Sequence, residues 1–261
     1  MNLKNKIAVI TGGNGILGSK FAEGMVKAGA KVILLDINKE LVSGLEKFKD
    51  SIECYECDIT SKKSVQKAIK SIVDKHKTID ILLNNAASKS SNVAKFFESF
   101  ENYDLETWQE VMQVNVDGMF IVAQAVGSVM KNQKNGGSII QTSSIYGLVG
   151  PDESIYEGSE YLGGAINTPV VYSTSKAAVI GLTKSLAVYW AKNNIRVNCI
   201  VPGGIESGQN ETFISKYSKK VPMGRMGSPN EIVPAILYLA SNASSYVTGQ
   251  ILVVDGGFTA W

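Results

Sequence analysis

The chain has 261 residues, of which 44% are hydrophobic and 19% are charged, and this balance is typical of one folded domain with a sizeable core. A formal net charge of +2 argues against a nucleic-acid-binding surface, which needs a strong basic excess. No apolar run approaches the roughly 20 residues that span a membrane, and a strand pattern begins at Lys6, too early for a signal peptide. We therefore expect a cytoplasmic protein with neither a nucleic-acid nor a membrane partner.

Short apolar runs alternate with helix-length segments along the whole chain. We expect strands at residues 7–10, 32–35, 52–57, 79–83, 138–141, 195–201 and 251–254. We expect helices at residues 17–28, 38–49, 61–75, 105–131 and 173–191. Buried strands separated by helices predict an α/β fold of three layers, in which a parallel sheet of about seven strands carries helices on both faces. The composition does not change along the chain, so we predict a single domain over residues 1–261.

A glycine-rich loop separates the first strand from the first helix. Gly13, Gly15 and Gly18 form the pattern G-x-G-x-x-G. Glycines permit a tight turn and let a pyrophosphate approach the backbone, and the helix that follows offers free N–H groups to the phosphates. The pattern alone is weak, but the strand, turn and helix around it are the context that the motif requires. We predict that the loop binds a dinucleotide through Gly12, Asn14, Gly15, Ile16 and Leu17.

Asp36 ends the second predicted strand, about 20 residues after the glycines, where an acidic residue is found in dinucleotide-binding folds. A carboxylate at this point accepts hydrogen bonds from the adenosine ribose and repels a 2′-phosphate. The glycine loop contains no Arg or Lys, and Ile37 and Asn38 are neutral. We therefore expect NAD as the cofactor, with NADP less favoured. An Asp36 that only caps the next helix is compatible with either cofactor.

No metal site is expected from the cysteines and the histidine. Cys54 and Cys57 form a lone C-x-x-C, with no second pair and one histidine in the chain, so a tetrahedral zinc site lacks ligands. Three cysteines in all fit a reducing compartment, and we expect them to be structural. His76 lies near the end of a charged helix, where it can be solvated or interact favourably with the helix dipole. A Ser-His-Asp hydrolase is therefore not expected.

Tyr172 and Lys176 form the pattern Y-x-x-x-K at the start of a predicted helix. Residues four apart lie on one helix face, so the phenol and the ammonium point the same way. The pKa of a free Tyr is about 10, and a neighbouring cation lowers that pKa by favouring the phenolate. The pair can then exchange a proton with an alcohol or a carbonyl oxygen. Such pairs are common on helix surfaces, so the weight of this one depends on the motifs around it.

Further motifs join this pair in an order that resembles the short-chain dehydrogenase/reductase family over essentially the whole chain. They are Asn84-Asn85-Ala86-Ala87, Val114-Asn115-Val116, Gln141-Thr142-Ser143-Ser144, Pro202-Gly203-Gly204-Ile205 and Asp255-Gly256-Gly257. The first differs from the family's N-N-A-G in having Ala87 for Gly. The resemblance implies a Rossmann-type doubly wound sheet and an NAD(P)-dependent oxidoreductase that acts on CH–OH groups of a small-molecule substrate. It also implies a homo-oligomer, either a tetramer or a dimer.

The resemblance implies roles for individual residues. Tyr172 would be the general acid/base, Lys176 would lower its pKa and bind the nicotinamide ribose, and Asn115 would support a water-linked proton relay. Ser144 would hold the substrate oxygen, and it is favoured over Ser143 because its spacing to the next glycine matches the family's Ser-x-x-Gly. The implied cofactor contacts are Asp58 and Ile59 at the adenine, Asn85 and Ala86 after the fourth strand, Pro202, Gly203 and Ile205 near the nicotinamide, and Ser207 in place of a usual Thr.

Two departures from the commonest family pattern concern the substrate. Ile16 stands where a glycine is usual, a spacing that resembles longer relatives that modify nucleotide sugars. The stretch between Ser144 and Tyr172 is roughly 15 residues longer than usual, and loops of this length are usually functional or disordered. We therefore expect residues 148–171 to form an active-site insertion.

The composition of this insertion, rich in tyrosine and carboxylates, suits a polyhydroxylated ligand. The arrangement also resembles dehydrogenases associated with bacterial flagellin and surface-glycan sugar biosynthesis. An ordinary surface insertion and a pocket for a non-sugar substrate stay open as alternatives.

The favoured function is hydride transfer between the nicotinamide and a secondary alcohol or ketone, with a sugar derivative as one candidate substrate. The first alternative is a 3-oxoacyl-[acyl-carrier-protein] reductase, which would prefer NADPH and carry a basic patch for its acidic partner. The second alternative is a protein that senses NAD without turnover. Residues 203–228 are expected to form a substrate-side loop. Phe213, Tyr217, Met223 and Met226 are candidates to line the substrate side, although core packing explains the methionines equally well.

Overall fold

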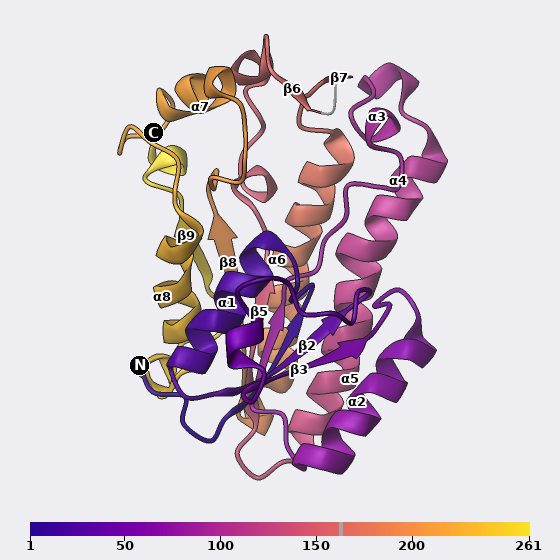
Figure 1. The fold of residues 1–261 in the computed structure, drawn as a ribbon, viewed down its shortest axis with the longest axis vertical. Helices are drawn as coiled ribbons and strands as arrows, with labels where there is room; N and C mark the ends of the chain where they lie inside the picture. The colour runs from indigo at the N-terminus through magenta and orange to yellow at the C-terminus, as the bar shows by residue number, and fades with distance from the viewer. Residues whose placement is uncertain (162–163) are drawn as a thin grey trace.

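A seven-stranded sheet forms the centre of the structure, a computed structural model that describes residues 1–161 and 164–261 (Figure 1). Residues 162 and 163 of the predicted insertion lie outside the described part. The strands run in the order β3-β2-β1-β4-β5-β8-β9, and every neighbouring pair is parallel. They are β1 (Ile7–Thr11), β2 (Lys31–Asp36), β3 (Ile52–Glu56), β4 (Ile81–Asn84), β5 (Gly137–Thr142), β8 (Ile195–Pro202) and β9 (Ile251–Val254). This arrangement confirms the predicted Rossmann-type sheet.

Helices cover both faces of the sheet. One face carries α1 (Ile16–Lys27) and α8 (Pro229–Ala240). The other carries α2 (Lys62–His76), α5 (Met119–Lys131) and α6 (Val170–Trp190). The strands read as continuous apolar runs because both of their faces are buried beneath helices.

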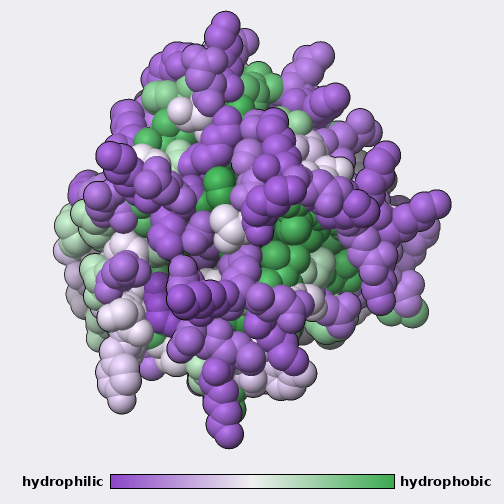
Figure 2. All heavy atoms as spheres, turned by 90° about the horizontal axis from the view of Figure 1, so that it is seen from below, coloured by the Kyte–Doolittle hydropathy of each residue, from purple (hydrophilic) through white to green (hydrophobic). Residues whose placement is uncertain are grey.

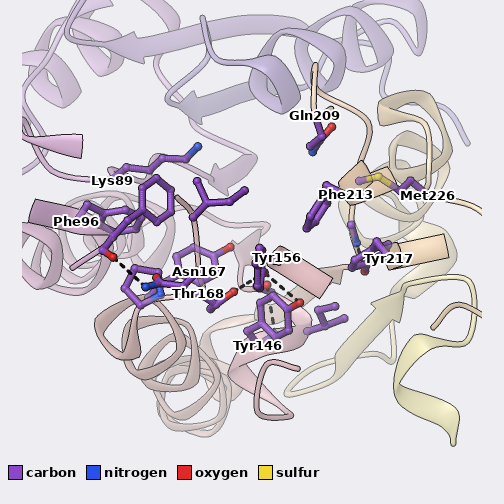
Figure 3. Close-up of a pocket in the computed structure, with 18 residues that line it drawn as sticks. Lys89, Phe96, Tyr146, Tyr156, Asn167, Thr168, Gln209, Phe213, Tyr217 and Met226 are labelled. Atoms are coloured by element: carbon purple, nitrogen blue, oxygen red, sulfur yellow. Dashed lines mark hydrogen bonds between the residues drawn. The ribbon is translucent and has the colours of Figure 1, made fainter. Parts of the chain in front are cut away.

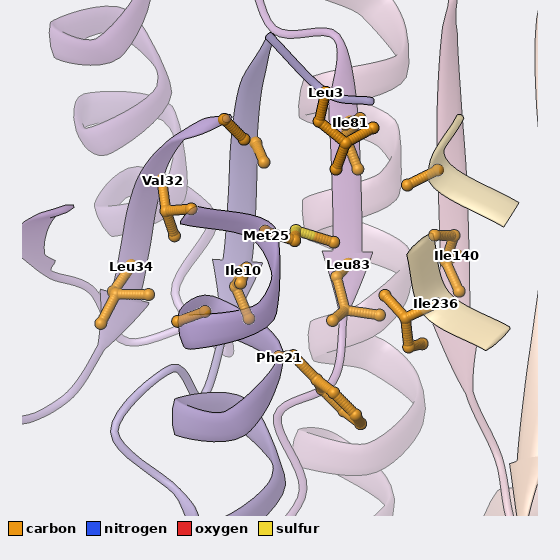
Figure 4. Close-up of a cluster of buried hydrophobic side chains, with 14 of the residues drawn as sticks. Leu3, Ile10, Phe21, Met25, Val32, Leu34, Ile81, Leu83, Ile140 and Ile236 are labelled. Carbon is orange, nitrogen blue, oxygen red and sulfur yellow. The ribbon is translucent and has the colours of Figure 1, made fainter. Parts of the chain in front are cut away.

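β1 shows how alternate side chains of a strand divide between the two cores. Ala8 and Ile10 belong to the apolar cluster beneath α1 and α8, whereas Val9 belongs to the cluster beneath α2 and α5. Figure 4 shows Ile10 in one cluster with Phe21 and Met25 of α1. Burying an Ile or Phe side chain contributes about 1.5–3 kcal/mol. A one-residue slip of β1 would exchange the two sets of side chains, so this register is strongly specified.

The predicted helix over residues 105–131 is continuous but has three parts. α4 (Leu105–Met112) passes into a π-helical segment, Gln113–Gly118, which continues as α5. The helix begins where Asp104 accepts a hydrogen bond from the backbone N–H of Thr107 at 2.7 Å. π-helical segments are rare and often occur at functional sites, and this one carries Asn115.

The strand order reverses between β1 and β4, which defines the crevice where such folds bind ligands, beyond the carboxyl ends of the strands. Figure 1 shows several short elements gathered at the end toward which the β8 arrow points. They are α3 (Val93–Phe96), α7 (Glu211–Ser218) and an antiparallel pair of strands, β6 (Glu160–Tyr161) and β7 (Gly164–Ala165). The last two belong to the predicted insertion and were not expected to form strands.

The helix predicted over residues 38–49 is wrong. Only a 3₁₀ turn, Glu46–Phe48, forms in this segment. Gly44 has a φ of +95°, which a helix does not allow. The side chain of Asn38 accepts a hydrogen bond from the backbone N–H of Glu40 at 3.0 Å, which stabilises a turn in place of a helix. Leu45 is buried and fixes this connection against the core.

Among the described helices, none is long and apolar enough to cross a membrane. Figure 2 shows the face seen from below, where hydrophilic side chains dominate and apolar side chains appear in separate patches between them.

Candidate active site

The glycine-rich loop joins β1 to α1 and has no room for side chains at its closest approaches. A Cβ atom on Gly18 would collide with the carbonyl oxygen of Gly12, and Gly12 itself has a φ of +61°. α1 begins at Ile16, directly after Gly15 as the N-cap residue. Because Gly15 has no side chain to cap the helix, the first N–H groups of α1 stay available to a ligand. The loop therefore fits a pyrophosphate group.

Asp36, at the end of β2, lies beside this loop. One carboxylate oxygen accepts a hydrogen bond from the backbone N–H of Asn14 at 2.9 Å, and the other accepts from that of Asn38 at 3.0 Å. Each oxygen keeps a further lone pair for a ribose hydroxyl. The side chain of Asn14 donates to the carbonyl oxygen of Asn38 at 2.7 Å and so fastens the loop to the chain after β2. Asp36 therefore caps a turn and not the helix that the sequence predicted.

Thr11 connects the glycine loop to the end of β4. Its hydroxyl donates to Oδ1 of Asn84 at 3.2 Å and accepts from the backbone N–H groups of Asn85 and Ala86 at 2.9 and 3.0 Å. Asn84 donates in turn to the carbonyl oxygen of Met119 at 2.8 Å. The predicted cofactor contacts Asn85 and Ala86 are thus fixed beside the loop, on the other side of the crevice.

The predicted adenine contacts follow β3. Asp58 is exposed, and its carboxylate accepts hydrogen bonds from the backbone and the hydroxyl of Thr60 at 2.9 and 2.7 Å. The Ile59 side chain is buried against the backbone of Gly118. Only the backbone of Ile59 is therefore placed to meet a cofactor.

The predicted nicotinamide contacts follow β8, which ends at Pro202. Gly203 donates its N–H to a β9 carbonyl oxygen at 3.0 Å, and Ile205 pairs with Gly227 in an isolated bridge. Ser207 is exposed, and its hydroxyl accepts from the side chain of Gln209 at 2.9 Å. Of these residues, Gly203 lies directly against the cavity described below.

Tyr172 and Lys176 lie one turn apart near the start of α6. The Nζ atom of Lys176 lies 5.8 Å from the centre of the Tyr172 ring and donates to the carbonyl oxygen of Thr142 at 3.2 Å. Burial raises the pKa of Tyr172, while the Ser144 side chain acts to lower it. Burial lowers the pKa of Lys176 to about 8. The expected lowering of the Tyr172 pKa is therefore not seen here, because burial disfavours the charged phenolate.

The two serines after β5 have different surroundings. The hydroxyl of Ser143 donates to the carbonyl oxygen of Lys176 at 2.6 Å, so it ties β5 to α6. The hydroxyl of Ser144 accepts from the backbone N–H of Tyr146 at 3.3 Å, and Ser144 lines the same cavity as Tyr172. Of the pair, Ser144 is the one placed to meet a substrate.

Asn115 is fully buried beside α6. Its Oδ1 accepts from the backbone N–H of Ser88 at 2.8 Å, and its Nδ2 donates to the hydroxyl of Ser175 at 3.3 Å. That hydroxyl donates to the carbonyl oxygen of Tyr172 at 2.8 Å. Asn115 therefore connects the segment after β4 to the turn of α6 that carries the tyrosine.

A cavity of about 290 Å³ contains both Ser144 and Tyr172 in its lining (Figure 3). Aromatic side chains supply much of its wall: Phe96, Phe97, Tyr146, Tyr156, Phe213 and Tyr217. Of the candidates from the substrate-side loop, Phe213, Tyr217 and Met226 line this cavity, whereas Met223 does not and is 63% exposed. The volume lies just below the roughly 300–1,000 Å³ that is typical of ligand pockets.

The insertion supplies one side of the cavity. The hydroxyl of Tyr156 forms hydrogen bonds with the hydroxyls of Thr168 and Tyr146, and the Tyr156 ring stacks on Phe213 with a centroid distance of 5.4 Å. Burial raises the pKa of both Tyr146 and Tyr156, so these hydroxyls stay protonated. Tyr156 of the insertion therefore packs against Tyr146 and Phe213 in the cavity wall.

The carboxylates of the insertion do not face the cavity, which corrects the expectation that they would meet a ligand. Asp152 forms an ion pair with Lys220 at 2.7 Å, and Glu157 forms one with Lys216 at 3.4 Å. Lys216 also donates to the carbonyl oxygens of Ser154 and Glu157 at 3.1 and 2.8 Å. These charges fasten the insertion to α7 and the residues after it. No acidic residue in the described part of the chain lines the cavity.

Lys89, Phe96 and Phe97 also line the cavity and were missed from the sequence. They lie on the connection after β4, and the side chain of Asn167 in the insertion donates to the carbonyl oxygen of Phe97 at 2.9 Å. The sequence could have indicated this segment, because it follows the strand at which the sheet order reverses, and residues there commonly contact the ligand.

The remaining polar candidates lie away from this cavity. Cys54 and Cys57 are free thiols, and burial raises the pKa of Cys54 to about 11, so this thiol stays protonated. His76 ends α2, where its Nε2 lies 3.3 Å from a carboxylate oxygen of Glu53.

The doubly wound sheet, the glycine loop at its reversal point and the adjoining cavity define an oxidoreductase that uses a nicotinamide dinucleotide. The profile of the family described as enoyl-(acyl carrier protein) reductase matches residues 13–259. The 3-oxoacyl-[acyl-carrier-protein] reductase FabG of Thermotoga maritima is 35% identical over 98% of this chain and 99% of its own length. The ribulose-forming D-arabinitol 2-dehydrogenase of Candida tropicalis is 34% identical over 99% of this chain and 94% of its own length.

A solved structure agrees with these sequence relatives. The short chain dehydrogenase from Leptospira borgpetersenii with bound NAD⁺ is 38% identical, with a TM-score of 0.88 over 99% of this chain and 94% of that one. The chain therefore belongs to the short-chain dehydrogenase/reductase family, whose members bind NAD(P) and act on alcohol or ketone groups.

Proposed function

We propose that this protein is an NAD-dependent enzyme that interconverts a secondary alcohol and a ketone on a small hydroxylated substrate. The observation that carries the proposal is the cavity in which Ser144 and Tyr172 meet, with Lys176 behind the tyrosine. The arabinitol dehydrogenase relative supports a polyol or sugar-like substrate. Tyrosine rings in the wall also suit such a ligand, because aromatic faces pack against sugar carbons and hydroxyls bind hydroxyls.

In the oxidative direction, Tyr172 takes the hydroxyl proton of the substrate, and Ser144 holds the substrate oxygen by hydrogen bonding. Bound NAD supplies the acceptor for the hydride, which leaves the carbinol carbon with its electron pair, so the alcohol becomes a ketone. A positive charge on Lys176, one turn further along α6, is proposed to favour the phenolate against the effect of burial. Because burial raises the pKa of Tyr172, we expect oxidation to become faster as the pH rises. In reduction, Tyr172 returns the proton to the forming alcohol.

In this scheme Asn115 positions Tyr172 and does not itself contact the substrate. Its hydrogen bonds to Ser88 and Ser175 hold the turn of α6 that presents Tyr172. The water-linked proton relay implied by the family resemblance is part of the proposal.

NAD is the proposed cofactor because Asp36 places a negative charge where a 2′-phosphate would lie. Its neighbour Ile37 is neutral and 79% exposed, so it offers no counter-charge. The Leptospira neighbour, which was solved with bound NAD⁺, supports the same choice.

A narrower proposal is that the substrate is a sugar derivative of surface-glycan biosynthesis. It rests on the resemblance of the insertion to dehydrogenases of that process, with Tyr156 as the insertion's aromatic contribution to the cavity. The carboxylates of the insertion no longer support it, because Asp152 and Glu157 are paired with lysines outside the cavity.

A second candidate is a 3-oxoacyl-[acyl-carrier-protein] reductase that uses NADPH. The Thermotoga relative and the description of the matching family favour it. Reduction of acetoacetyl thioester with NADPH and with NADH, measured beside oxidation of polyols with NAD and NADP, distinguishes the two candidates.

The central test is the variant Tyr172→Phe, which removes the proton carrier and keeps the ring. We expect kcat to fall by about 10²–10⁴, the usual contribution of general acid–base catalysis, while the Kd for NADH measured by fluorescence stays the same. Tyr246→Phe is the matched control, because Tyr246 is fully exposed and does not line the cavity. Full activity of Tyr172→Phe would overturn the proposal. A wild-type protein that binds NADH but turns over no alcohol, ketone or sugar would favour an NAD sensor.

A further inference from the structure

We propose that the substrate is a hydroxy acid, whose carboxylate binds at Lys89 while its reacting carbinol lies against Tyr172 and Ser144. The inference rests on the proposed function and narrows its substrate class. Lys89 is the one charged residue among the described residues that line the cavity. The rest of that lining is aromatic, aliphatic or neutral and polar, so a negative charge on the substrate meets one positive charge and no described acidic residue.

Ion pairs hold two of the insertion's carboxylates, Asp152 and Glu157, outside the cavity lining. A third, Glu153, accepts a hydrogen bond from the backbone of Thr168 and is not itself a lining residue. Asp152 and Glu157 belong to the segment that forms one wall, yet each is held by a lysine of α7 or just after it. The lysine contacts keep both carboxylates out of the lining. The described lining residues therefore carry one positive charge and no negative charge, and a cleft of one sign concentrates ligands of the opposite sign.

The position of Lys89 fits a short substrate. It stands on the connection that leaves β4 at the reversal of the sheet order, and Figure 3 shows its amino end extending into the open space that Gln209 faces from the other side. Lys89 is exposed at the mouth of the cavity, where an entering substrate can meet it. A small molecule fits between the mouth and the catalytic pair, because the cavity holds about 290 Å³.

The number of cations favours a carboxylate over a phosphate ester. Phosphate sites usually combine several cationic or backbone donors to hold a doubly charged group. The described lining offers the single ammonium of Lys89, a flexible point charge with three donors. One ammonium matches one carboxylate, and the hydroxyls of Tyr146, Tyr156 and Thr168 remain for the substrate's hydroxyl groups.

The test compares acids and polyols that share a carbon chain. D-gluconate and D-glucitol form the six-carbon pair, and D-xylonate and xylitol form the five-carbon pair. With NAD, we expect the wild type to oxidise the acid of at least one pair with a kcat/KM about tenfold higher than its polyol, which corresponds to about 1.4 kcal/mol of charge-assisted binding. We expect Lys89→Met to remove this preference through KM, and Lys89→Arg to retain it. Because Lys89 is exposed, the preference should also shrink in 0.5 M salt.

Lys95→Met is the matched control. Lys95 is an exposed lysine of α3 outside the cavity, where it pairs with Asp104 at 3.2 Å, and its loss should leave the acid-to-polyol ratio unchanged. A wild type that prefers the polyol in both pairs, or a ratio that is unaltered in Lys89→Met, overturns the hydroxy-acid proposal while leaving the dehydrogenase assignment intact. Failure to oxidise or reduce anything in a broad panel of alcohols and ketones overturns both.

Discussion

The carboxylate of Asp36 accepts hydrogen bonds from the backbone N–H groups of Asn14 and Asn38. Its remaining lone pairs are available to the adenosine ribose of the proposed cofactor. Removing it with Asp36→Ala deletes the acceptors for the adenosine ribose and the repulsion toward a 2′-phosphate. Lys39 then becomes the nearest charged residue in the sequence. We expect kcat/KM for NAD to fall about tenfold, the cost of one or two hydrogen bonds to a charged group, and kcat/KM for NADP to rise.

The measurement is the ratio of the two kcat/KM values with one substrate. Asp50→Ala serves as the control, because it removes the same charge from an exposed position beyond the 3₁₀ turn. A ratio that stays the same in Asp36→Ala would show that cofactor choice depends on other residues.

At the scale of elements, Glu53 connects β3 to the neighbouring strand β2 and to the end of helix α2. Its carboxylate lies 3.3 Å from Lys31 of β2 and 2.9 and 3.3 Å from Lys75 and His76 at the end of α2. Burial acts to raise the pKa of Glu53, but hydrogen bonds from Lys75, His76 and Lys31 outweigh it and hold the pKa at about 2. The folded pKa is thus below the unfolded value of 4.5. The resulting stability is present above about pH 4.5 and is lost as the pH falls toward 2.

We therefore expect Glu53→Gln to lower the free energy of unfolding by about 2 kcal/mol at pH 7. The deficit relative to the wild type should shrink steadily below pH 4.5. Urea unfolding of both proteins at pH 7, 5 and 3 measures this difference in the free energy of unfolding. Glu56→Gln is the matched control, since Glu56 lies on the same strand but is exposed. An equal loss in both variants would mean that the ion pairs around Glu53 contribute nothing.

Strands and helices whose pattern lies within a short stretch of sequence were predicted correctly. Features that depend on contacts between distant residues were not. All seven strands of the sheet follow from buried apolar runs, and the helix expected over residues 61–75 is α2, which Ser61 caps. The helix over residues 38–49 was predicted from a charged pattern and does not form, because Gly44, with its φ of +95°, ends any helix there. The direction of Asp152 and Glu157 depends on α7, some 60 residues away, and no periodicity carries that pairing. Lys89 lies in a loop, and its place in the cavity depends on how that loop folds against the insertion.

At the scale of the whole molecule, apolar side chains gather on the outer surfaces of α5 and α6. Val188 and Tyr189 of α6 are 82% and 71% exposed, and Phe120 of α5 is 47% exposed. A hollow of about 370 Å³ between these helices is lined by Phe120, Tyr189 and Trp190, among others. Exposed apolar groups that cluster on one face commonly mark an interface. We propose that this face pairs with a second copy of the chain, giving a homodimer or a homotetramer.

Placing a charge on this face should weaken the pairing. Val188→Asp would bury an unpaired carboxylate in the interface, a cost of several kcal/mol that a standard interface of about 1,600 Å² cannot easily absorb. Light scattering after size-exclusion chromatography should therefore give a lower mass for Val188→Asp than for the wild type. Ser43→Asp adds the same charge on the exposed connection between β2 and β3 and should leave the mass unchanged. A monomeric wild type, or an oligomer that Val188→Asp leaves intact, would show that α5 and α6 do not form the contact. Because Tyr172 lies on the same helix as Val188, a fall in activity that is restored at higher protein concentration would show that pairing also steadies the catalytic turn of α6.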